Sequence, residues 1–221
     1  MSEFFSQYGA LILSAVGQTL LMVVLSTFFG YLLGIPLGVV AYVTDHGSIS
    51  ENRVVNSIVG WVINIIRSVP FIILIIFLIP YTRVIMGTAS GTRGVIFPLV
   101  VGSAPFIARM VESSFNELDR GVIESARAMG ATNFQIIWKV LLPESFPSLL
   151  RGMSIATITI IGYIAMAGMV GGGGLGAVAI NYGYYRYERS VMNVTIVLLI
   201  LLVQLIQLLF SAVVRRVDKN K

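Results

Sequence analysis

Long apolar runs separated by short polar segments constrain this chain more than any other feature of its sequence. Hydrophobic residues make up 57% of its 221 residues and charged residues only 11%, a balance far from that of soluble globular domains. About 20 apolar residues in helical conformation cross about 30 Å of hydrocarbon. We therefore predict an all-α integral membrane protein with about five transmembrane helices, at Leu20–Val43, within Ser57–Tyr81, and at Val95–Val111, Leu149–Val170 and Val191–Val214.

The second apolar run allows two interpretations, because Arg67 interrupts it. A span over about Ser57–Tyr81 places Arg67 well inside the membrane, where a guanidinium is costly. A span that begins near Arg67 lets its side chain extend to the cytoplasmic headgroups. We favour the second interpretation, since it buries no charge.

The first span carries small residues in its second half, where Gly30, Gly34 and Gly38 flank Pro36. Such residues permit a kink or a close approach between membrane helices. The stretch before it, Phe4–Val16, is only moderately apolar, and we predict that it is interfacial or a lead-in to the first helix.

Basic residues indicate how the chain is oriented. Five spans place the termini on opposite sides of the membrane. Ten Lys and Arg residues fall on the side of the C-terminus, namely Arg53, Arg109, Arg120, Arg127, Lys139, Arg151, Arg215, Arg216, Lys219 and Lys221. Four fall on the other side, namely Arg83, Arg93, Arg186 and Arg189. Since cytoplasmic segments carry the excess, we predict a multi-pass protein of the cytoplasmic (inner) membrane with its N-terminus outside, and we attribute the net charge of +5 to this excess rather than to nucleic-acid binding.

The sequence offers no catalytic or metal-binding set. It has no cysteine, and its one histidine, His46, lies in the polar loop Thr44–Asn52 without other metal ligands, so we interpret it as a solvated loop residue. There is no zincin motif, triad or Walker A lysine, and the run Gly171–Gly174 lacks the Lys-Ser/Thr of a phosphate-binding loop. No basic residue precedes Arg53, so we expect no cleaved secretory signal. We predict no cofactor, no metal and no enzymatic activity.

One polar segment, residues 116–147, separates the third and fourth spans, and its first half has the signals of a short helix. Asp119 can cap this helix. Gly130 should end it, because glycine takes the left-handed conformation without a Cβ penalty. Apolar residues follow helical spacing between the two, at Val122, Ile123, Ala126 and Met129.

The second half of this segment has the signals of another helix. Thr132 with Gln135 three residues later makes a capping box. Apolar residues then form one stripe, at Phe134, Ile137, Trp138 and Leu141, before Pro143 and Pro147 interrupt the run. Two such short helices cannot span a bilayer, but they can lie at its surface and present a shaped face to the water.

The same segment resembles the EAA loop of ABC-importer permeases. That family pattern is E-A-A, three residues, G, nine residues and I-x-L-P, and here Glu124-Ser125-Ala126, Gly130 and Val140-Leu141-Leu142-Pro143 match its spacing. Two positions depart from it, Ser125 for Ala and Val140 for Ile. Segments 67–73, 104–112 and 181–184 look similar to the methionine-uptake members of that family.

The resemblance implies a permease subunit of an ATP-driven importer for L- and/or D-methionine, formed by one transmembrane domain over residues 1–221. Two permeases would pair with two ATPase subunits, and a periplasmic or lipid-anchored methionine-binding protein would deliver the substrate. The helix at about Asp119–Met129 would dock in a cleft of the ATPase. The residues that the family motif assigns to this coupling are Glu124, Ser125, Ala126, Arg127, Met129 and Gly130.

A transport pathway is predicted along the fourth span, whose faces are unusually small and polar. Thr159, Gly162, Met166 and Met169 share one face of this helix. Met166 lies near its outer end, where two copies meeting at a dimer axis would form an apolar plug, since the flexible thioether repacks easily. Two other functions are open, a passive channel or facilitator for a small amino acid and a membrane scaffold, although neither requires a helix–Gly–helix docking element.

Overall fold

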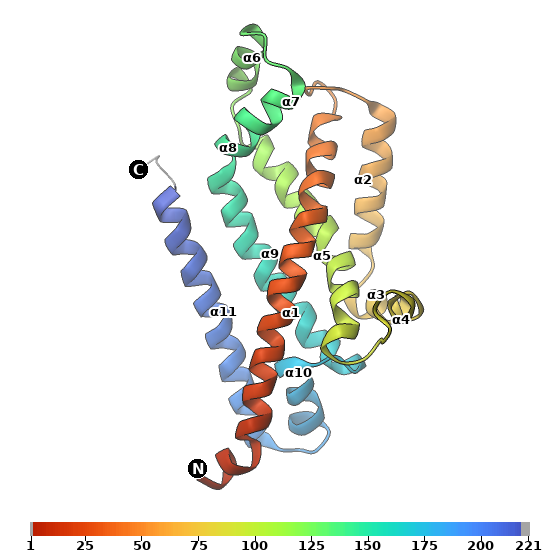
Figure 1. Cartoon of the computed structure of the whole chain (residues 1–221), viewed down its shortest axis with the longest axis vertical. Helices are drawn as coiled ribbons and strands as arrows, with labels where there is room; N and C mark the ends of the chain where they lie inside the picture. The colour runs from red at the N-terminus through yellow and green to blue at the C-terminus, as the bar shows by residue number, and fades with distance from the viewer. Residues whose placement is uncertain (1, 218–221) are drawn as a thin grey trace.

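The computed structural model describes residues 2–217, which contain helices and connecting turns but no β-strand (Figure 1). The long helices are α1 (Ser2–Val43), α2 (Arg53–Ser68), α5 (Gly91–Asn116), α9 (Phe146–Ala167) and α11 (Arg189–Val217). Short helices join them, namely α3 (Phe71–Phe77), α4 (Ile79–Met86), α6 (Arg120–Ala128), α7 (Asn133–Ile136), η1 (Ile137–Leu141), α8 (Leu142–Glu144), η2 (Gly168–Val170), α10 (Gly174–Val178) and η3 (Ala179–Tyr184). Three residues used in the sequence-based orientation, Met1, Lys219 and Lys221, lie outside the described residues.

Between residues 2 and 217, four helical segments are long and apolar enough to cross a membrane alone, at Ser6–Val43, Gly91–Asn116, Phe146–Val170 and Arg189–Val217. Helices α2 and α3 together make a fifth candidate. In Figure 1, α1, α5 and α11 run in one direction and α2 and α9 in the other, so the two ends of the chain lie at opposite ends of the bundle. The prediction of about five apolar spans in an all-α protein is thus confirmed.

The first span is longer than predicted. Helix α1 continues without a break from Ser2 to Val43, through Pro36, so Phe4–Val16 is an integral part of it. The glycines of its second half lie against α5: an added Cβ would come within 2.6 Å of Ile107 Cγ2 at Gly34 and within 2.6 Å of the Ala108 carbonyl oxygen at Gly38. The predicted close approach of helices at these small residues is confirmed.

Of the two interpretations of Arg67, the one in which a span starts near Arg67 is wrong, because α2 begins at Arg53 and Arg67 lies in its last turn. The other interpretation, a span over about Ser57–Tyr81 that contains Arg67, agrees with the α2–α3 candidate span, which is bent by 101°. The physical cause is local: Val69 is extended, with φ −84° and ψ 124°, and Pro70 lacks the N–H needed to continue the helix.

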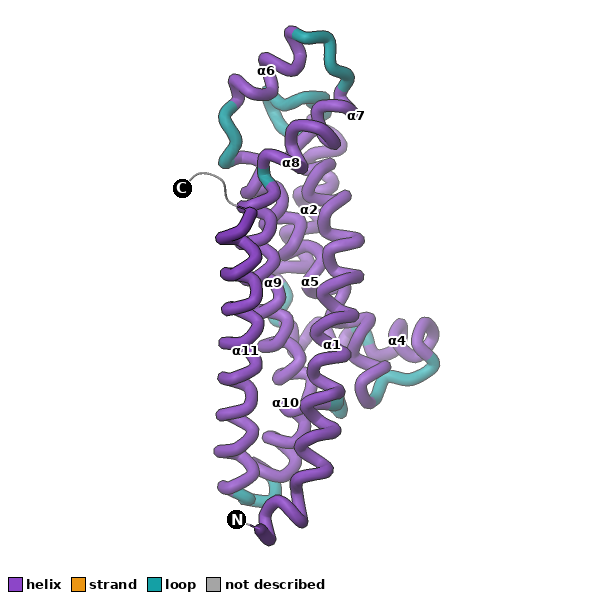
Figure 2. The backbone as a smooth tube through the Cα atoms, turned by 60° about the vertical axis from the view of Figure 1, so that its left-hand side comes forward, coloured by secondary structure: helices purple, strands orange, loops and turns teal. Residues whose placement is uncertain are grey.

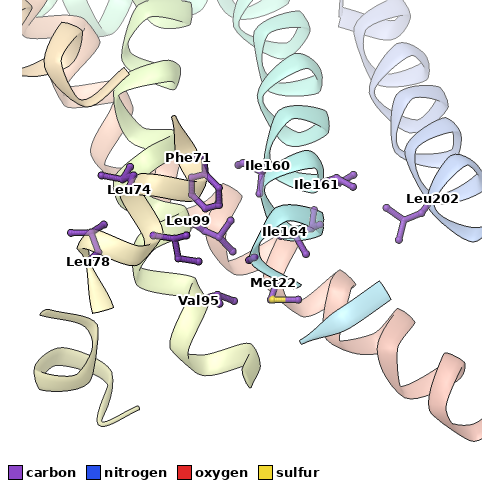
Figure 3. Close-up of a cluster of buried hydrophobic side chains, with 13 residues drawn as sticks. Met22, Phe71, Leu74, Leu78, Val95, Leu99, Ile160, Ile161, Ile164 and Leu202 are labelled. Carbon is purple, nitrogen blue, oxygen red and sulfur yellow. The ribbon is translucent and has the colours of Figure 1, made fainter. Parts of the chain in front are cut away.

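Buried side chains from four of the long segments meet between the helices (Figure 3). Met22 of α1, Leu99 of α5 and Ile160 of α9 are almost completely buried there. The bent segment contributes Phe71, Leu74 and Leu78 to the same cluster, and α11 contributes Leu202. Figure 2 shows α3 and α4 standing out to the side of the bundle rather than continuing along it.

The glycine run after α9 is a tight turn held by α1. Gly171 and Gly174 have φ of 83° and 82°, conformations that glycine adopts without a Cβ penalty. Gln18 Oε1 accepts a hydrogen bond from the N–H of Gly174 at 2.8 Å, and Thr19 Oγ1 accepts one from Leu175 at 2.8 Å. Side chains of the first helix therefore satisfy backbone donors at the start of α10, and the run serves helix packing.

Candidate coupling surface and translocation face

The first half of the polar segment folds as predicted. Helix α6 is capped by Asp119, whose Oδ1 accepts a hydrogen bond from the N–H of Gly121 at 2.8 Å. It ends before Gly130, which has φ 82°. The N–H of Ala131 then returns to the carbonyl of Ala126 at 3.1 Å, satisfying an acceptor of the last turn.

The second half confirms the capping box but not the apolar stripe. Gln135 N–H donates to Thr132 Oγ1, and the Gln135 side chain accepts from the Thr132 N–H. Ile136 and Leu141 are the fully buried residues, whereas Phe134 and Trp138 are 69% and 59% exposed and lie with ring centroids 6.0 Å apart. The helix becomes a π-helix at Ile137–Leu141, and the wider turn changes which side chains share a face.

Helix α6 has one buried face and one exposed face. Ile123 and Ala126 pack into a cluster with Phe115, Ile136 and Leu141, which joins the polar segment to the end of α5. Val122 is 42% exposed and Met129 83% exposed. Of the six predicted coupling residues, Ala126 is therefore a packing residue, and five lie exposed around the same end of the molecule, namely Glu124, Ser125, Arg127, Met129 and Gly130.

Arg127 makes a connection that sequence reasoning missed. Its guanidinium donates to the carbonyl of Ile49 at 2.6 Å, across 78 positions of sequence. Ile49 lies in the loop between α1 and α2, so α6 is tied to both helices. A polar cavity of about 150 Å³ lies beside this contact and is lined by residues of both segments, including Asp45, Ser48, Arg120 and Glu124. No local pattern in the sequence signals so distant a pairing.

The loop itself is organised by Glu51. Its carboxylate accepts hydrogen bonds from His46 Nδ1 at 2.9 Å, from the N–H of Gly47 at 3.0 Å and from Arg53 Nε at 3.3 Å. The hydrogen bond from His46, followed by that from Gly47, lowers the pKa of Glu51 to about 2. The same hydrogen bond and the charge of Glu51 raise the pKa of His46. Within residues 2–217 no group of three His, Cys, Asp or Glu side chains is placed to hold a metal ion.

The predicted pathway residues lie on one face of α9 and its extension. Met166 and Met169 are 44% and 57% exposed. Gly162 is exposed, and a Cβ placed on it would have no heavy atom within 4 Å. Thr159 is half-buried one turn away, and the opposite face carries the buried Ile160 and Ile164. The structure brings the four predicted residues together on a surface that nothing else in residues 2–217 covers.

An ion pair lies near the α6 end of α5. Arg109 Nη1 and Glu112 Oε2 are 2.7 Å apart, three positions apart on the same helix. Arg109 also donates to Asn64 Oδ1 at 3.0 Å, so the pair links α5 to α2.

These features define a class of protein: a polytopic helical membrane protein with a polar helix–Gly–helix segment at one end of its bundle and an uncovered face along one span. The chain belongs to the family described as "Binding-protein-dependent transport system inner membrane component", whose model matches residues 34–220. The resemblance to ABC-importer permeases is confirmed, as is the prediction of a transport subunit rather than an enzyme.

Named relatives agree with this assignment. The chain is 49% identical over 218 residues to the "Probable D-methionine transport system permease protein MetI" of Vibrio cholerae serotype O1, covering 99% of this chain and 97% of that protein. It is 51% identical over 158 residues to the "D-methionine transport system permease protein MetI" of Escherichia coli K12, covering 72% of this chain and 73% of that protein.

Solved structures agree in fold. A chain of the structure named "Inward facing conformations of the MetNI methionine ABC transporter" matches with a TM-score of 0.95 and 49% identity, over 96% of this chain and 99% of that one. An amino acid ABC transporter solved with histidines matches with a TM-score of 0.79 at 19% identity, over 96% of each chain. At 19% identity, the second match supports a shared fold alone.

Proposed function

We propose that this chain is the permease subunit of an ATP-driven importer for methionine, as the L and/or the D form, in the cytoplasmic membrane. Two copies pair with two ATPase subunits, and an external binding protein delivers the substrate. Support comes from relatives named as D-methionine permeases, at 49% identity over 99% of this chain and 51% identity over 72% of it, and from the likeness to a methionine ABC transporter structure. Residues 1–221 act as one transmembrane domain in this assembly.

The observation that carries the mechanism is the exposed side chain of Met129 at the end of α6. Met129 is an apolar residue in a polar segment at the end of the bundle, and its side chain is 83% exposed. Burying such a side chain in a partner contributes roughly 1.5–3 kcal/mol. Together with the exposed Glu124, Ser125 and Arg127, it forms a small mixed surface that fits a cleft on the ATPase.

Motion of this surface reaches the spans by two routes. The buried Ile123 and Ala126 pack against Phe115 at the end of α5. Arg127 holds the loop between α1 and α2 through the Ile49 carbonyl. ATP-driven approach of two ATPase subunits therefore moves α6 and, with it, three spans as rigid elements, so that the pathway alternates between its two sides.

The orientation follows from charge. The end of the bundle that carries α6 also carries the described Arg53, Arg120, Arg127, Arg215 and Arg216. An excess of basic residues supports assignment of this end to the cytoplasm, with the N-terminal end outside. That is the side on which a cytoplasmic ATPase meets α6.

The translocation pathway runs between the uncovered faces of α9 in the two permease copies. Met166 is 44% exposed beside small neighbours, and two Met166 side chains across the dimer axis form the outer plug. Thr159, Gly162 and Met169 line the same face. Small residues leave room for a substrate when the copies separate.

Variants of the coupling helix test this function. Gly130→Val forces a β-branched residue to φ 82°, at a cost of about 1–2 kcal/mol or more, and Glu124→Lys reverses an exposed charge. Both should weaken co-purification of the ATPase and reduce ATP-driven methionine uptake in proteoliposomes. Gly130→Asn is the matched control, because asparagine tolerates the left-handed region, and it should retain both properties. Wild-type uptake by both Gly130→Val and Glu124→Lys would disprove the coupling role.

A further inference from the structure

A cavity lies beside the break between α2 and α3. Arg67, which carries a guanidinium group, is one of the residues that line it. The cavity has a volume of about 170 Å³ and is lined by Arg67, Phe71 and Tyr163 together with Ile66, Val69, Leu74, Gly102 and Phe106. It therefore combines one cation with an otherwise apolar and aromatic wall. Four helices, α2, α3, α5 and α9, contribute residues to its lining.

This cavity lies near the middle of the membrane-spanning part of the bundle. Gly102, on its wall, is an interior residue of α5, which runs from Gly91 to Asn116. At about 1.5 Å per residue it lies roughly 16 Å from one end of that helix and roughly 21 Å from the other. The cavity that Arg67 lines is thus far from both ends of this apolar helix.

Arg67 has no counter-charge within the described chain. The ion pairs of residues 2–217 involve His46, Arg53 and Arg109, and no carboxylate lies within 4.0 Å of Arg67. Arg67 is exposed and lines the cavity. An arginine inside a membrane is costly unless it contacts water or an anion. The position of Arg67 therefore favours an anionic ligand that binds and dissociates.

The aromatic wall of the cavity is a stacked pair of rings that lines the same cavity as Arg67. The rings of Phe71 and Tyr163 are stacked, with centroids 4.3 Å apart and planes inclined by 7°. Gly102 lets Phe71 lie flat on α5, since a Cβ there would come within 3.1 Å of the Phe71 ring. Aromatic rings attract a thioether sulfur at about 5 Å, with roughly 0.3–1.5 kcal/mol.

The cavity adjoins the uncovered face of α9. Tyr163 directly follows Gly162 and lies one helical turn beyond Thr159, both of which belong to the predicted pathway face. A molecule moving along that face therefore passes the mouth of the Arg67 cavity.

We propose that Arg67 binds the carboxylate of the translocated α-amino acid midway across the membrane, while the Phe71–Tyr163 pair forms the wall against its apolar side chain. The proposal rests on the proposed function, since it takes the substrate to be an amino acid that passes along α9. The lining of the cavity indicates the ligand class. The guanidinium of Arg67 binds one carboxylate, and the rings of Phe71 and Tyr163 contact an apolar or thioether side chain.

Methionine uptake tests this proposal in proteoliposomes that hold the full complex of permease, ATPase and binding protein. Arg67→Gln removes the charge and should lower the uptake rate about tenfold or more, the equivalent of one lost charge-assisted hydrogen bond. Arg67→Lys should retain more uptake than Arg67→Gln. Arg83→Gln is the matched control: Arg83 is an exposed arginine of α4 outside the cavity, and its removal should leave uptake at the wild-type rate.

Chemical restoration of the charge separates binding from folding. The chain has no native cysteine, so Arg67→Cys carries the only thiol of the permease. After assembly, a methanethiosulfonate that adds an ammonium group should restore uptake, and one that adds a sulfonate should not. The wild-type complex treated with the same reagents controls for thiols of the other subunits.

Two outcomes would overturn the proposal while leaving the proposed function intact: wild-type uptake by an assembled Arg67→Gln complex, or an equal response of Arg67→Cys to both reagents. If Arg67→Gln does not assemble, the proposal is tested by comparing the uptake of the assembled Arg67→Cys complex after the ammonium reagent with its uptake after the sulfonate reagent. A wild-type complex that takes up no methionine would instead disprove the proposed function and this inference with it.

Discussion

Glu51 gives the loop between α1 and α2 its shape through hydrogen bonds from His46, Gly47 and Arg53, and the loop in turn receives Arg127 of the coupling helix. A raised His46 pKa means that protonated His46 stabilises the loop below pH 6.5, its ordinary value, and that this contribution is lost as pH rises through the raised pKa. The lowered Glu51 pKa stabilises the loop above pH 4.5, and that contribution is lost as pH falls towards about 2. The two groups therefore stabilise the loop most between pH 4.5 and 6.5.

This residue-scale account predicts a change in the titration of His46. Glu51→Gln should bring the pKa of His46 back towards 6.5, because the hydrogen bond and the charge of Glu51 are its two largest causes. NMR of the imidazole in the purified permease measures it directly. Asp45→Asn is the control, because the charge of Asp45 is the smallest of the causes that shift the pKa of His46. This variant should lower that pKa less than Glu51→Gln does. An unchanged His46 pKa in Glu51→Gln would contradict the account.

Residue-scale signals in the sequence predicted the local geometry well. The Asp119 cap, the left-handed Gly130 and the Thr132–Gln135 box were all predictable, because each depends on atoms within a few positions of chain. The exposure of Phe134 and Trp138 was not predictable, because the π-helix at Ile137–Leu141 changes which side chains share a face. The Arg127–Ile49 contact was not predictable either, because it depends on tertiary packing.

At the scale of elements, α9 divides the bundle into a packed side and an uncovered side. Its buried residues, among them Ile160 and Ile164, join the core, whereas Gly162, Met166 and Met169 face outward. Helical spacing alone placed the four pathway residues on one face. Spacing did not reveal that this face is uncovered, because exposure depends on where α1, α5 and α11 pack.

Met166→Ala tests the plug on that face. A buried methionine truncated to alanine costs about 2–5 kcal/mol, but Met166 is 44% exposed, so the variant should assemble with its ATPase and lose little stability. The expected result is a raised leak of methionine from loaded vesicles without ATP, or ATP hydrolysis uncoupled from uptake.

Ile155→Ala is the control for this variant, since Ile155 is 53% exposed on the same helix about three turns towards the coupling end; it should leave the closed state tight. An assembled Met166→Ala complex that stays tight and transports at the wild-type rate would show that the plug lies elsewhere.

The bend between α2 and α3 shows where element-scale prediction from sequence ends. Pro70 marks a break, but a proline also permits a kinked span that continues in the same direction. Val69 and Pro70 break the helix locally, but the packing of α3 after the turn of 101° includes the stack of Phe71 on Tyr163, a residue 92 positions away in the chain. The sequence interpretation that placed Arg67 inside a span did not include this bend.

The whole molecule connects two surfaces. At one end, α6 and the loop of Glu51 form a rigid block fixed to α5 by Phe115 and Ile123. Along one side, α9 has an uncovered face with Gly162, Met166 and Met169. Under the proposed function, this face meets the second copy and the substrate, and the energy for transport enters from the ATPase subunits through α6.

Uptake of labelled methionine into proteoliposomes containing permease, ATPase and binding protein is the most direct test of this central claim. The ATP lies on the side of α6, and methionine and binding protein lie on the other. The account predicts that methionine accumulates inside above its external concentration, and only with both ATP and binding protein present. Uptake that merely equilibrates methionine, at the same rate without ATP, would identify a passive facilitator and contradict the account.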